Sequence, residues 1–259
     1  MKLSKFIFWF ASPMRFMPLA QRSVRPLRYL ALICAALGLY FGFALTPADA
    51  VQGEAYRIIF LHVPASWVAM FCFGLMAFWS AMGLIWRTRL AHLLAHALAP
   101  TGAVFAALSL ITGALWGQPM WGTWWVWDAR LTSSLLLLLL YLGYLALLGS
   151  VDDPSRADRA CAVLALLGAI NLPVMYFSVT WWNTLHQGAS LSSHGASMAP
   201  LSLAALLLCI LAAWSWAAAT VLQRVQLLIQ EREAHTHWLH EIQRGSQASI
   251  SLTQELTHG

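Results

Sequence analysis

The chain has 259 residues, of which 60% are hydrophobic and only 10% are charged, and its formal net charge is +5. An average soluble domain contains about 25% charged residues, so this composition excludes a soluble globular protein. The basic residues lie mainly between and beside long apolar segments. The positive charge therefore indicates a membrane topology and not a nucleic-acid-binding surface.

Six long apolar segments follow one another along the chain. Each is close to the roughly 20 residues that a helix needs to cross a bilayer. Lipid offers no hydrogen-bond partners to the backbone, so spans of this kind must be helical. The sequence thus predicts an all-α integral membrane protein, a bundle of six transmembrane helices. The predicted spans cover about residues 29–45, 58–86, 97–117, 131–150, 160–180 and 200–223.

The positions of the basic residues predict an orientation. Only two of the fifteen Lys and Arg residues, Arg57 and Arg130, lie on the side opposite to the other thirteen. The positive-inside rule then places both termini in the cytoplasm. We expect a six-span membrane domain with an N-terminal cytoplasmic segment over residues 1–223 and a cytoplasmic C-terminal tail over 224–259. The outward connections are about 46–57, 118–130 and 181–199.

Prolines and glycines add two local expectations. Residues 6–20 are apolar but contain Pro13 and Pro18, which predicts a broken, interfacial segment before the first span. The G-x-x-x-G spacing, which lets helix backbones approach closely, occurs twice, and we interpret it as helix packing only. The two pairs are Gly38 with Gly42 and Gly113 with Gly117.

The second outward connection, WGQPMWGTWWVWDARLTS, is dense in tryptophan. Tryptophans often anchor helix ends at the membrane surface, and that role would explain one or two of them. The higher density here predicts a continuous aromatic surface on which a large planar ligand can stack. The five residues are Trp116, Trp121, Trp124, Trp125 and Trp127.

Asp128 and Arg130 end this connection where the fourth span begins. Asp128 has the position of a helix N-cap, a role that is compatible with a further function. Arg130 has three possible roles: a bidentate pair with a ligand carboxylate, a local pair with Asp128, or extension to the lipid headgroups.

Three histidines fall in the outward parts of the predicted topology: His62 in RIIFLHVPASW, His186 in WWNTLHQGAS, and His194. A single histidine at a membrane surface is more often a hydrogen-bonded residue than a ligand. His62 and His186, however, come from distant segments and flank the tryptophan-rich connection. This pairing favours a shared ligand.

Two imidazoles, an aromatic surface and two outward arginines, Arg57 and Arg130, form a set that matches haem. Histidines are common axial ligands of iron, indoles stack on the macrocycle, and arginines pair with propionates. Zinc would require three or four close ligands. A membrane b-type cytochrome would require histidines buried between facing spans. Both alternatives therefore fit less well.

At these residues the sequence resembles the CcmC family of haem-handling membrane proteins. WGTWWVWDARLTS at 121–133 is similar to the family's tryptophan-rich WWD signature, and the resemblance extends over about residues 29–223. RIIFLHVPASW, WWNTLHQGAS, APTGAVF and NLPV are similar to other family segments. The resemblance implies that His62 and His186 are the axial ligands. It also implies that the other haem-binding residues are Trp121, Trp124, Trp125, Trp127, Asp128, Arg57 and Arg130.

The resemblance further implies a non-enzymatic protein of the bacterial inner membrane that holds haem b (iron protoporphyrin IX) at the periplasmic face. It implies delivery of haem to the chaperone CcmE during cytochrome c maturation, with the ABC transporter subunits CcmA and CcmB and the small membrane protein CcmD as partners. Two alternatives are a haem-translocating channel subunit of an ABC-type exporter complex and a scaffold with no ligand. The scarcity of charged side chains within the spans argues against the channel.

Overall fold

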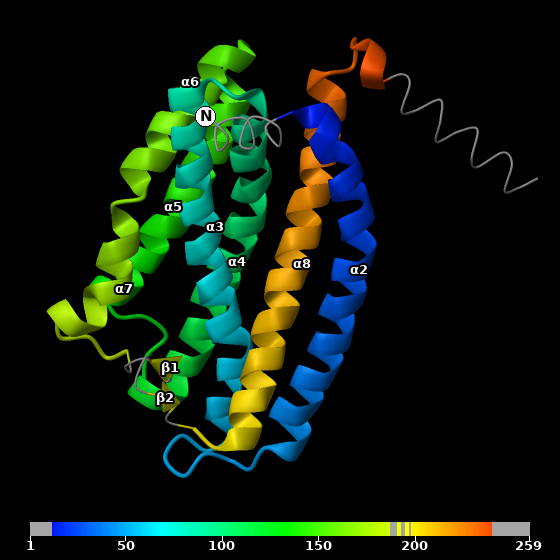
Figure 1. The fold of residues 1–259 in the computed structure, drawn as a ribbon. Coiled ribbons are helices and arrows are strands. Elements are labelled where there is room, and N and C mark those ends of the chain that lie inside the picture. Colours follow the sequence, from blue (N-terminus) through cyan, green and yellow to red (C-terminus); the bar gives the residue numbers. More distant parts are fainter. Residues whose placement is uncertain (1–11, 187–190, 193–194, 197, 240–259) are drawn as a thin grey trace, which may run out of the picture.

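The computed structural model describes residues 12–186, 191–192, 195–196 and 198–239. In this part of the chain, six helical segments are long and apolar enough to cross a membrane, so the predicted six-span fold is confirmed (Figure 1). The segments are Pro13–Leu45, Glu54–Trp86, Arg89–Trp121, Ala129–Ser150, Pro154–Trp181 and Pro200–Arg232.

Several segments contain more than one helical element. In chain order the elements are α2 (Pro13–Tyr40), the π-helix η1 (Phe41–Leu45), the 3₁₀ helix η2 (Glu54–Ile58), α3 (Ile59–Trp86), α4 (Arg89–Trp121), α5 (Ala129–Ser150), α6 (Pro154–Gly168), α7 (Asn171–Trp181) and α8 (Pro200–Arg232). Before α8, the two-residue strands β1 (Leu191–Ser192) and β2 (Gly195–Ala196) pair antiparallel.

The helices form two groups (Figure 1). In the first group α3 packs extensively on α4, α5 packs on α4, α6 packs on α3 and α5, and α7 packs on α5. In the second group α2 packs along α8, which in turn contacts α3 and α4. Tyr141 on α5 binds three helices together, because its hydroxyl donates to the Ala69 carbonyl at 2.7 Å while its ring end lies against Gly102. A Cβ atom at Gly102 would lie 2.1 Å from that hydroxyl oxygen, so this approach requires glycine.

The first helix begins earlier than predicted. Helix α2 continues from Pro13 to Tyr40 with Pro18 and Pro26 inside it, so the break expected in residues 6–20 is not present from residue 13 onward. Pro13 occupies the first helical turn, where its missing N–H needs no partner. Residues 6–11 of the predicted interfacial segment lie outside the described residues.

The fifth span, predicted as one segment over 160–180, consists of two helices. Helix α6 ends at Gly168 and α7 begins at Asn171. Pro173 has no N–H for a helical bond to Ala169, whose carbonyl accepts from Leu172 at 3.1 Å instead. Asn171 also donates from its side chain to the Ser133 carbonyl at 2.9 Å. The break thus attaches α7 to the start of α5.

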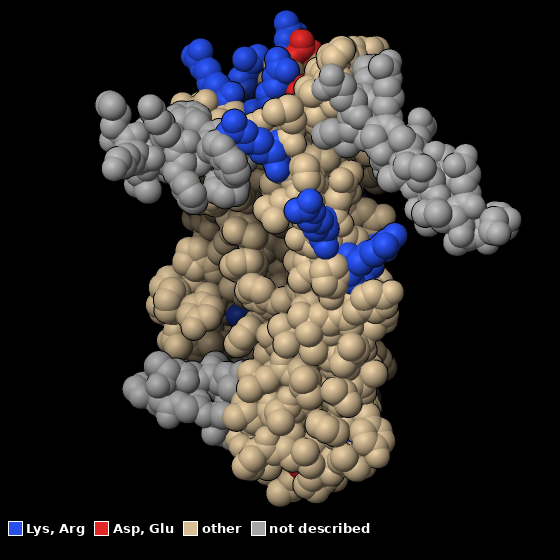
Figure 2. All heavy atoms as spheres, turned by 45° about the vertical axis from the view of Figure 1, so that its right-hand side comes forward, with Lys and Arg blue, Asp and Glu red and all other residues tan. Residues whose placement is uncertain are grey.

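The connections that hold the predicted outward residues meet at one end of the bundle, opposite to the start of α2 and the end of α8 (Figure 1). Figure 2 shows that the Lys and Arg side chains of the visible face gather over the half that holds the start of α2 and the end of α8. Helix α8 itself continues without a break from Pro200 to Arg232, across the predicted domain boundary at residue 223.

Candidate functional site

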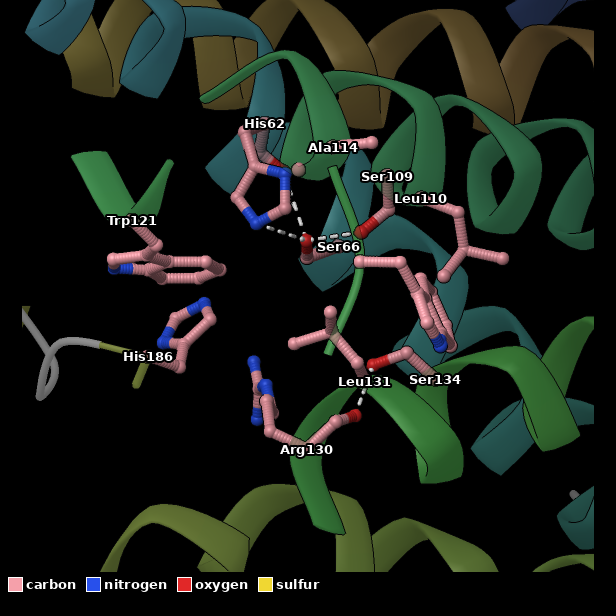
Figure 3. Close-up of a pocket in the computed structure, with 12 residues that line it drawn as sticks. His62, Ser66, Ser109, Leu110, Ala114, Trp121, Arg130, Leu131, Ser134 and His186 are labelled. Atoms are coloured by element: carbon pink, nitrogen blue, oxygen red, sulfur yellow. Dashed lines mark hydrogen bonds between the residues drawn. The ribbon is translucent and has the colours of Figure 1, made fainter. Parts of the chain in front are cut away.

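A pocket lies where the first turns of α3 and α5 meet the last turns of α4 (Figure 3). The connection before α5 and the segment after α7 complete its wall. Its lining residues are His62, Ser66, Ser109, Leu110, Gly113, Ala114, Trp121, Trp125, Arg130, Leu131, Ser134 and His186.

The pocket brings together the two histidines predicted from the sequence. The ring centroids of His62 and His186 lie 6.1 Å apart, with an interplanar angle of 39°. Figure 3 shows both imidazoles bordering the same space, beside Trp121. A metal–imidazole bond measures about 2 Å in zinc sites, so two imidazoles on opposite sides of one metal ion have centroids roughly 6 Å apart. The observed spacing fits one metal ion between the rings.

His62 is held firmly in the first turns of α3. Only 9% of the residue is exposed, and its ring packs edge-on against Trp116 with centroids 5.8 Å apart. Its Nδ1 lies 3.1 Å from the Thr112 hydroxyl, and its Nε2 lies 3.5 Å from the Ser66 hydroxyl. Ser66 also contacts Ser109 at 2.6 Å between their hydroxyl oxygens. No motif in the sequence pointed to these hydroxyl residues, although Ser66 lies four positions after His62 and therefore on the same helix face.

The tryptophans do not form the single continuous surface predicted from their spacing. Trp121 and Trp125 line the pocket, whereas Trp124 and Trp127 are 58% and 75% exposed. Trp116 is buried and donates from Nε1 to the Gln52 side chain at 2.8 Å. Position along the chain did not distinguish these three environments, because they depend on how the connection folds over α4.

The indole N–H of Trp125 and the carboxylate of Asp128, both in the tryptophan-rich connection, have different surroundings. The ring of Trp125 packs edge-on against Trp127, with centroids 5.3 Å apart. Its Nε1 is buried and has no hydrogen-bond partner within the described ranges. Asp128 Oδ1 accepts from the Leu131 amide at 2.7 Å, which confirms the predicted N-cap of α5. The other carboxylate oxygen of Asp128 is buried and likewise has no partner among the residues described.

Glycines make room for two of the aromatic rings of the pocket, those of His62 and Trp121. A Cβ atom at Gly113 would lie 3.0 Å from His62 Cε1, and one at Gly117 would lie 2.9 Å from Trp121 Cε3. The interpretation of this pair as helix packing only is therefore wrong, since both glycines face the side chains of the pocket. Gly38 does serve helix packing, because its Cβ would lie 2.8 Å from the sulfur of Cys209 on α8.

The two outward arginines are separated. Arg130 lines the pocket and donates to the Met175 carbonyl on α7 at 2.7 Å. Figure 3 shows its guanidinium pointing toward the space beside His186. Arg57 is not a lining residue: it donates to the Gly42 carbonyl at 2.7 Å and to Thr46 at 2.9 Å, and it pairs with Glu54. Its contacts join η2 to the end of the first span.

The donor set distinguishes between kinds of metal site. Among the residues that the structure describes, no group of three or more His, Cys, Asp or Glu side chains is placed to hold a metal ion. Structural zinc would need four such ligands. Two imidazoles at metal-bridging distance, with indole rings and a guanidinium beside them, instead suit a planar chelate whose iron takes two axial ligands. His194 lies outside the described residues.

The fold and this pocket define a multi-pass helical membrane protein with a paired-histidine, tryptophan-lined site at one end of its bundle. The sequence matches the profile of the family described as Heme exporter protein C over residues 6–240. The chain belongs to the Heme exporter protein C family.

Individual relatives agree with this assignment. Heme exporter protein C of Bradyrhizobium diazoefficiens is 54% identical over 187 residues, which cover 72% of this chain and 71% of the relative. Heme exporter protein C of Escherichia coli K12 is 44% identical over 212 residues, covering 82% and 86% respectively. A putative cytochrome c biosynthesis ccmC-like mitochondrial protein of Marchantia polymorpha is 44% identical over 163 residues, covering 63% of this chain and 69% of its own length.

Proposed function

We propose that the pocket binds haem b and presents it to the haem chaperone CcmE during cytochrome c maturation, with His62 and His186 as the two axial ligands. The observation that carries this proposal is the 6.1 Å spacing of the two rings, which come from α3 and from the segment after α7. Membership in the Heme exporter protein C family supports haem as the ligand.

The remaining lining residues have separate roles in this proposal. Haem supplies an iron with two axial positions, a flat macrocycle and two propionate carboxylates. Trp121 and Trp125 offer ring faces for stacking, and Arg130 offers a guanidinium for a propionate. Asp128 caps α5 and so sets the direction from which Arg130 reaches the pocket. The buried Nε1 of Trp125 is a donor that a bound carboxylate or carbonyl would satisfy.

The exposed tryptophans have a different role. Trp124 and Trp127 lie in the same connection as Trp125 but are largely exposed. Their rings lie outside the pocket lining, where the haem edge and the surface of CcmE would meet them. Arg57 supports the pocket indirectly, because its bonds to Gly42 and Thr46 hold the connection that leads into α3.

The proposed location is the periplasmic face of the bacterial inner membrane. In the predicted topology, thirteen of the fifteen Lys and Arg residues lie on the side opposite to Arg57 and Arg130, so the positive-inside rule assigns that side to the cytoplasm. The protein acts as a non-enzymatic handler, and its proposed partners besides CcmE are CcmA, CcmB and CcmD. Exposed apolar side chains along the helices leave wide surface for lipid and for such membrane partners.

The experiment compares purified parent protein with His62→Ala and His186→Ala, each reconstituted with haem. Each variant loses one axial ligand, so we expect weaker haem binding and a shifted Soret band. Added imidazole should partly restore the parent spectrum. His235→Ala, at an exposed position beyond α8, is the matched control and should behave like the parent. Soret bands identical to the parent's in both pocket variants would refute axial ligation.

A further inference from the structure

Thr112 on α4 lies behind the His62 ring, on the side away from the pocket. Its hydroxyl oxygen is 3.1 Å from His62 Nδ1. The same oxygen lies 2.7 Å from the Leu108 carbonyl oxygen and 3.2 Å from the Ser109 carbonyl oxygen. Thr112 is thus the only residue with a side-chain hydrogen bond to this nitrogen among the described ranges.

These distances determine which ring nitrogen of His62 carries the hydrogen. A threonine hydroxyl has one hydrogen, and a carbonyl oxygen can only accept. The Thr112 hydrogen is therefore donated to the carbonyls of its own helix, which leaves its oxygen to accept from His62 Nδ1–H. In a neutral imidazole the other nitrogen, Nε2, then keeps its lone pair.

The surroundings of Nε2 leave that lone pair available. Its side-chain hydrogen-bonding neighbour in the described part of the chain is the Ser66 hydroxyl at 3.5 Å, which is too long for a strong bond. The Ser66 hydroxyl is instead 2.9 Å from the His62 carbonyl and 2.6 Å from the Ser109 hydroxyl. Nε2 is the nitrogen that an iron atom in the pocket would meet.

The side chains on the far side of Thr112 offer no second hydroxyl in the described part of the chain. Beyond Thr112 lies a second hollow of about 220 Å³ between α2, α3, α4 and α8. Its other lining residues include Leu61, Pro64, Phe105 and Cys209, and none of them carries a hydroxyl, amide or charged group. Without Thr112 the Nδ1–H group would lose its side-chain acceptor, with the Ser109 backbone, which also interacts with His62, as the remaining polar neighbour. Weakening the hydrogen bonding of a buried donor is unfavourable.

We propose that Thr112 is a positioning residue for the axial ligand: it accepts the Nδ1–H of His62 and thereby presents Nε2 to the iron. This inference rests on the proposed role of His62 in binding haem. A hydrogen bond to the distal nitrogen of a metal-bound imidazole fixes the tautomer and makes the ligand more basic, and losing it typically weakens metal affinity by about 10- to 100-fold.

The test uses Thr112→Val, which keeps the size and branching of the side chain but removes the hydroxyl. Thr112→Ser restores the hydroxyl. Thr101→Val is the matched control, since Thr101 is also on α4 and its buried hydroxyl has no partner among the described residues. The measurements are the haem dissociation constant, the reduction potential of bound haem, and the His62 tautomer in haem-free protein by nitrogen NMR.

In Thr112→Val we expect haem binding about 10- to 100-fold weaker. The potential should become more positive, because a less basic imidazole stabilises ferric iron less. The NMR spectrum should show loss of the single Nδ1–H tautomer. Thr112→Ser should recover all three properties, and Thr101→Val should match the parent.

Two results would overturn the role of Thr112. One is a Thr112→Val variant with parental affinity, potential and tautomer while His62→Ala still changes the Soret band; the proposed haem site would then stand without Thr112. The other is an equal loss in Thr101→Val, which would assign the effect to packing of α4. If His62→Ala leaves the Soret band unchanged, the haem-site proposal itself is refuted, and the tautomer measurement still reports whether Thr112 holds Nδ1.

Discussion

Arg232, the last residue of α8, forms a two-point ion pair with Asp158 on α6. The distances are 3.0 Å from Nη2 to Oδ1 and 3.2 Å from Nη1 to Oδ2. His96 on α4 reaches the same carboxylate at 2.7 Å and contacts the Tyr144 hydroxyl at 2.8 Å with its other ring nitrogen. One carboxylate therefore connects both helix groups at the end of the bundle away from the pocket.

Replacing the Asp158 carboxylate tests how much this link between the two helix groups contributes to stability. Asp158→Asn removes the charge that Arg232 and His96 share, and hydrogen bonds to charged groups contribute about 1.5–3 kcal/mol each. We expect a lower thermal unfolding midpoint in detergent, whereas haem bound per folded protein should stay the same because the pocket lies at the other end. Asp152→Asn, at a neighbouring exposed position, is the control. An unchanged midpoint in Asp158→Asn would show that the connection adds no stability.

The tryptophans of the WWD segment should differ in their effect on haem. Trp125→Ala removes a ring that lines the pocket, and an aromatic pair contributes about 0.5–1.5 kcal/mol beyond its buried area, or roughly 2- to 12-fold in the dissociation constant. Trp125→Phe should lose less. Trp124→Ala, which removes an exposed ring, should lower haem affinity less than Trp125→Ala.

The measurements for these variants are haem per protein and protein abundance in the membrane. Protein abundance distinguishes a tryptophan that stacks on haem from one that anchors the helix at the membrane surface. Loss of an interface anchor lowers protein yield and leaves haem per protein unchanged. Equal haem affinities in Trp124→Ala and Trp125→Ala would contradict the division seen in the structure. Lower abundance with normal haem content in Trp125→Ala would mean that this residue is a membrane anchor.

A side chain at Gly113 should displace the His62 ring. In Gly113→Ala the new Cβ would lie 3.0 Å from His62 Cε1, so the ring must shift away from α4 and from its position opposite His186. We expect reduced haem affinity and a shifted Soret band. Gly143→Ala on α5 is the control, because the nearest atom to its Cβ would be 4.0 Å away and alanine favours a helix. Normal spectra in Gly113→Ala would mean that the ring has another acceptable position.

Two substitutions of Asp128 separate its role as a helix cap from the role of its negative charge. Asp128→Ala removes the acceptor for the Leu131 amide and should destabilise the start of α5 by about 1 kcal/mol. Asp128→Asn keeps a good capping side chain but loses the carboxylate. If the residue acts by placing Arg130, the Asn variant retains haem affinity and the Ala variant loses part of it. Equal losses in haem titrations of both variants would instead indicate a role for the charge.

The sequence by itself determined the spans and the local features of the site. Span number follows from the length of apolar segments, because bilayer thickness sets how many residues a helix needs. The cap at Asp128 depends only on an amide three residues away, and the approximate position of His62 follows from the start of its span. Pro173 also marked the break between α6 and α7, although the sequence analysis treated that span as continuous.

Only the tertiary structure decided which of these residues meet. Trp121 and Trp124 are three positions apart, yet one lines the pocket and the other is exposed, because the connection turns at Gly122 with φ of +74°. Arg57 donates to the Gly42 carbonyl at the end of the first span, whereas Arg130 lines the pocket together with His186. These outcomes depend on contacts between segments far apart in the chain, whose relative positions are set by helix packing and not by any local pattern.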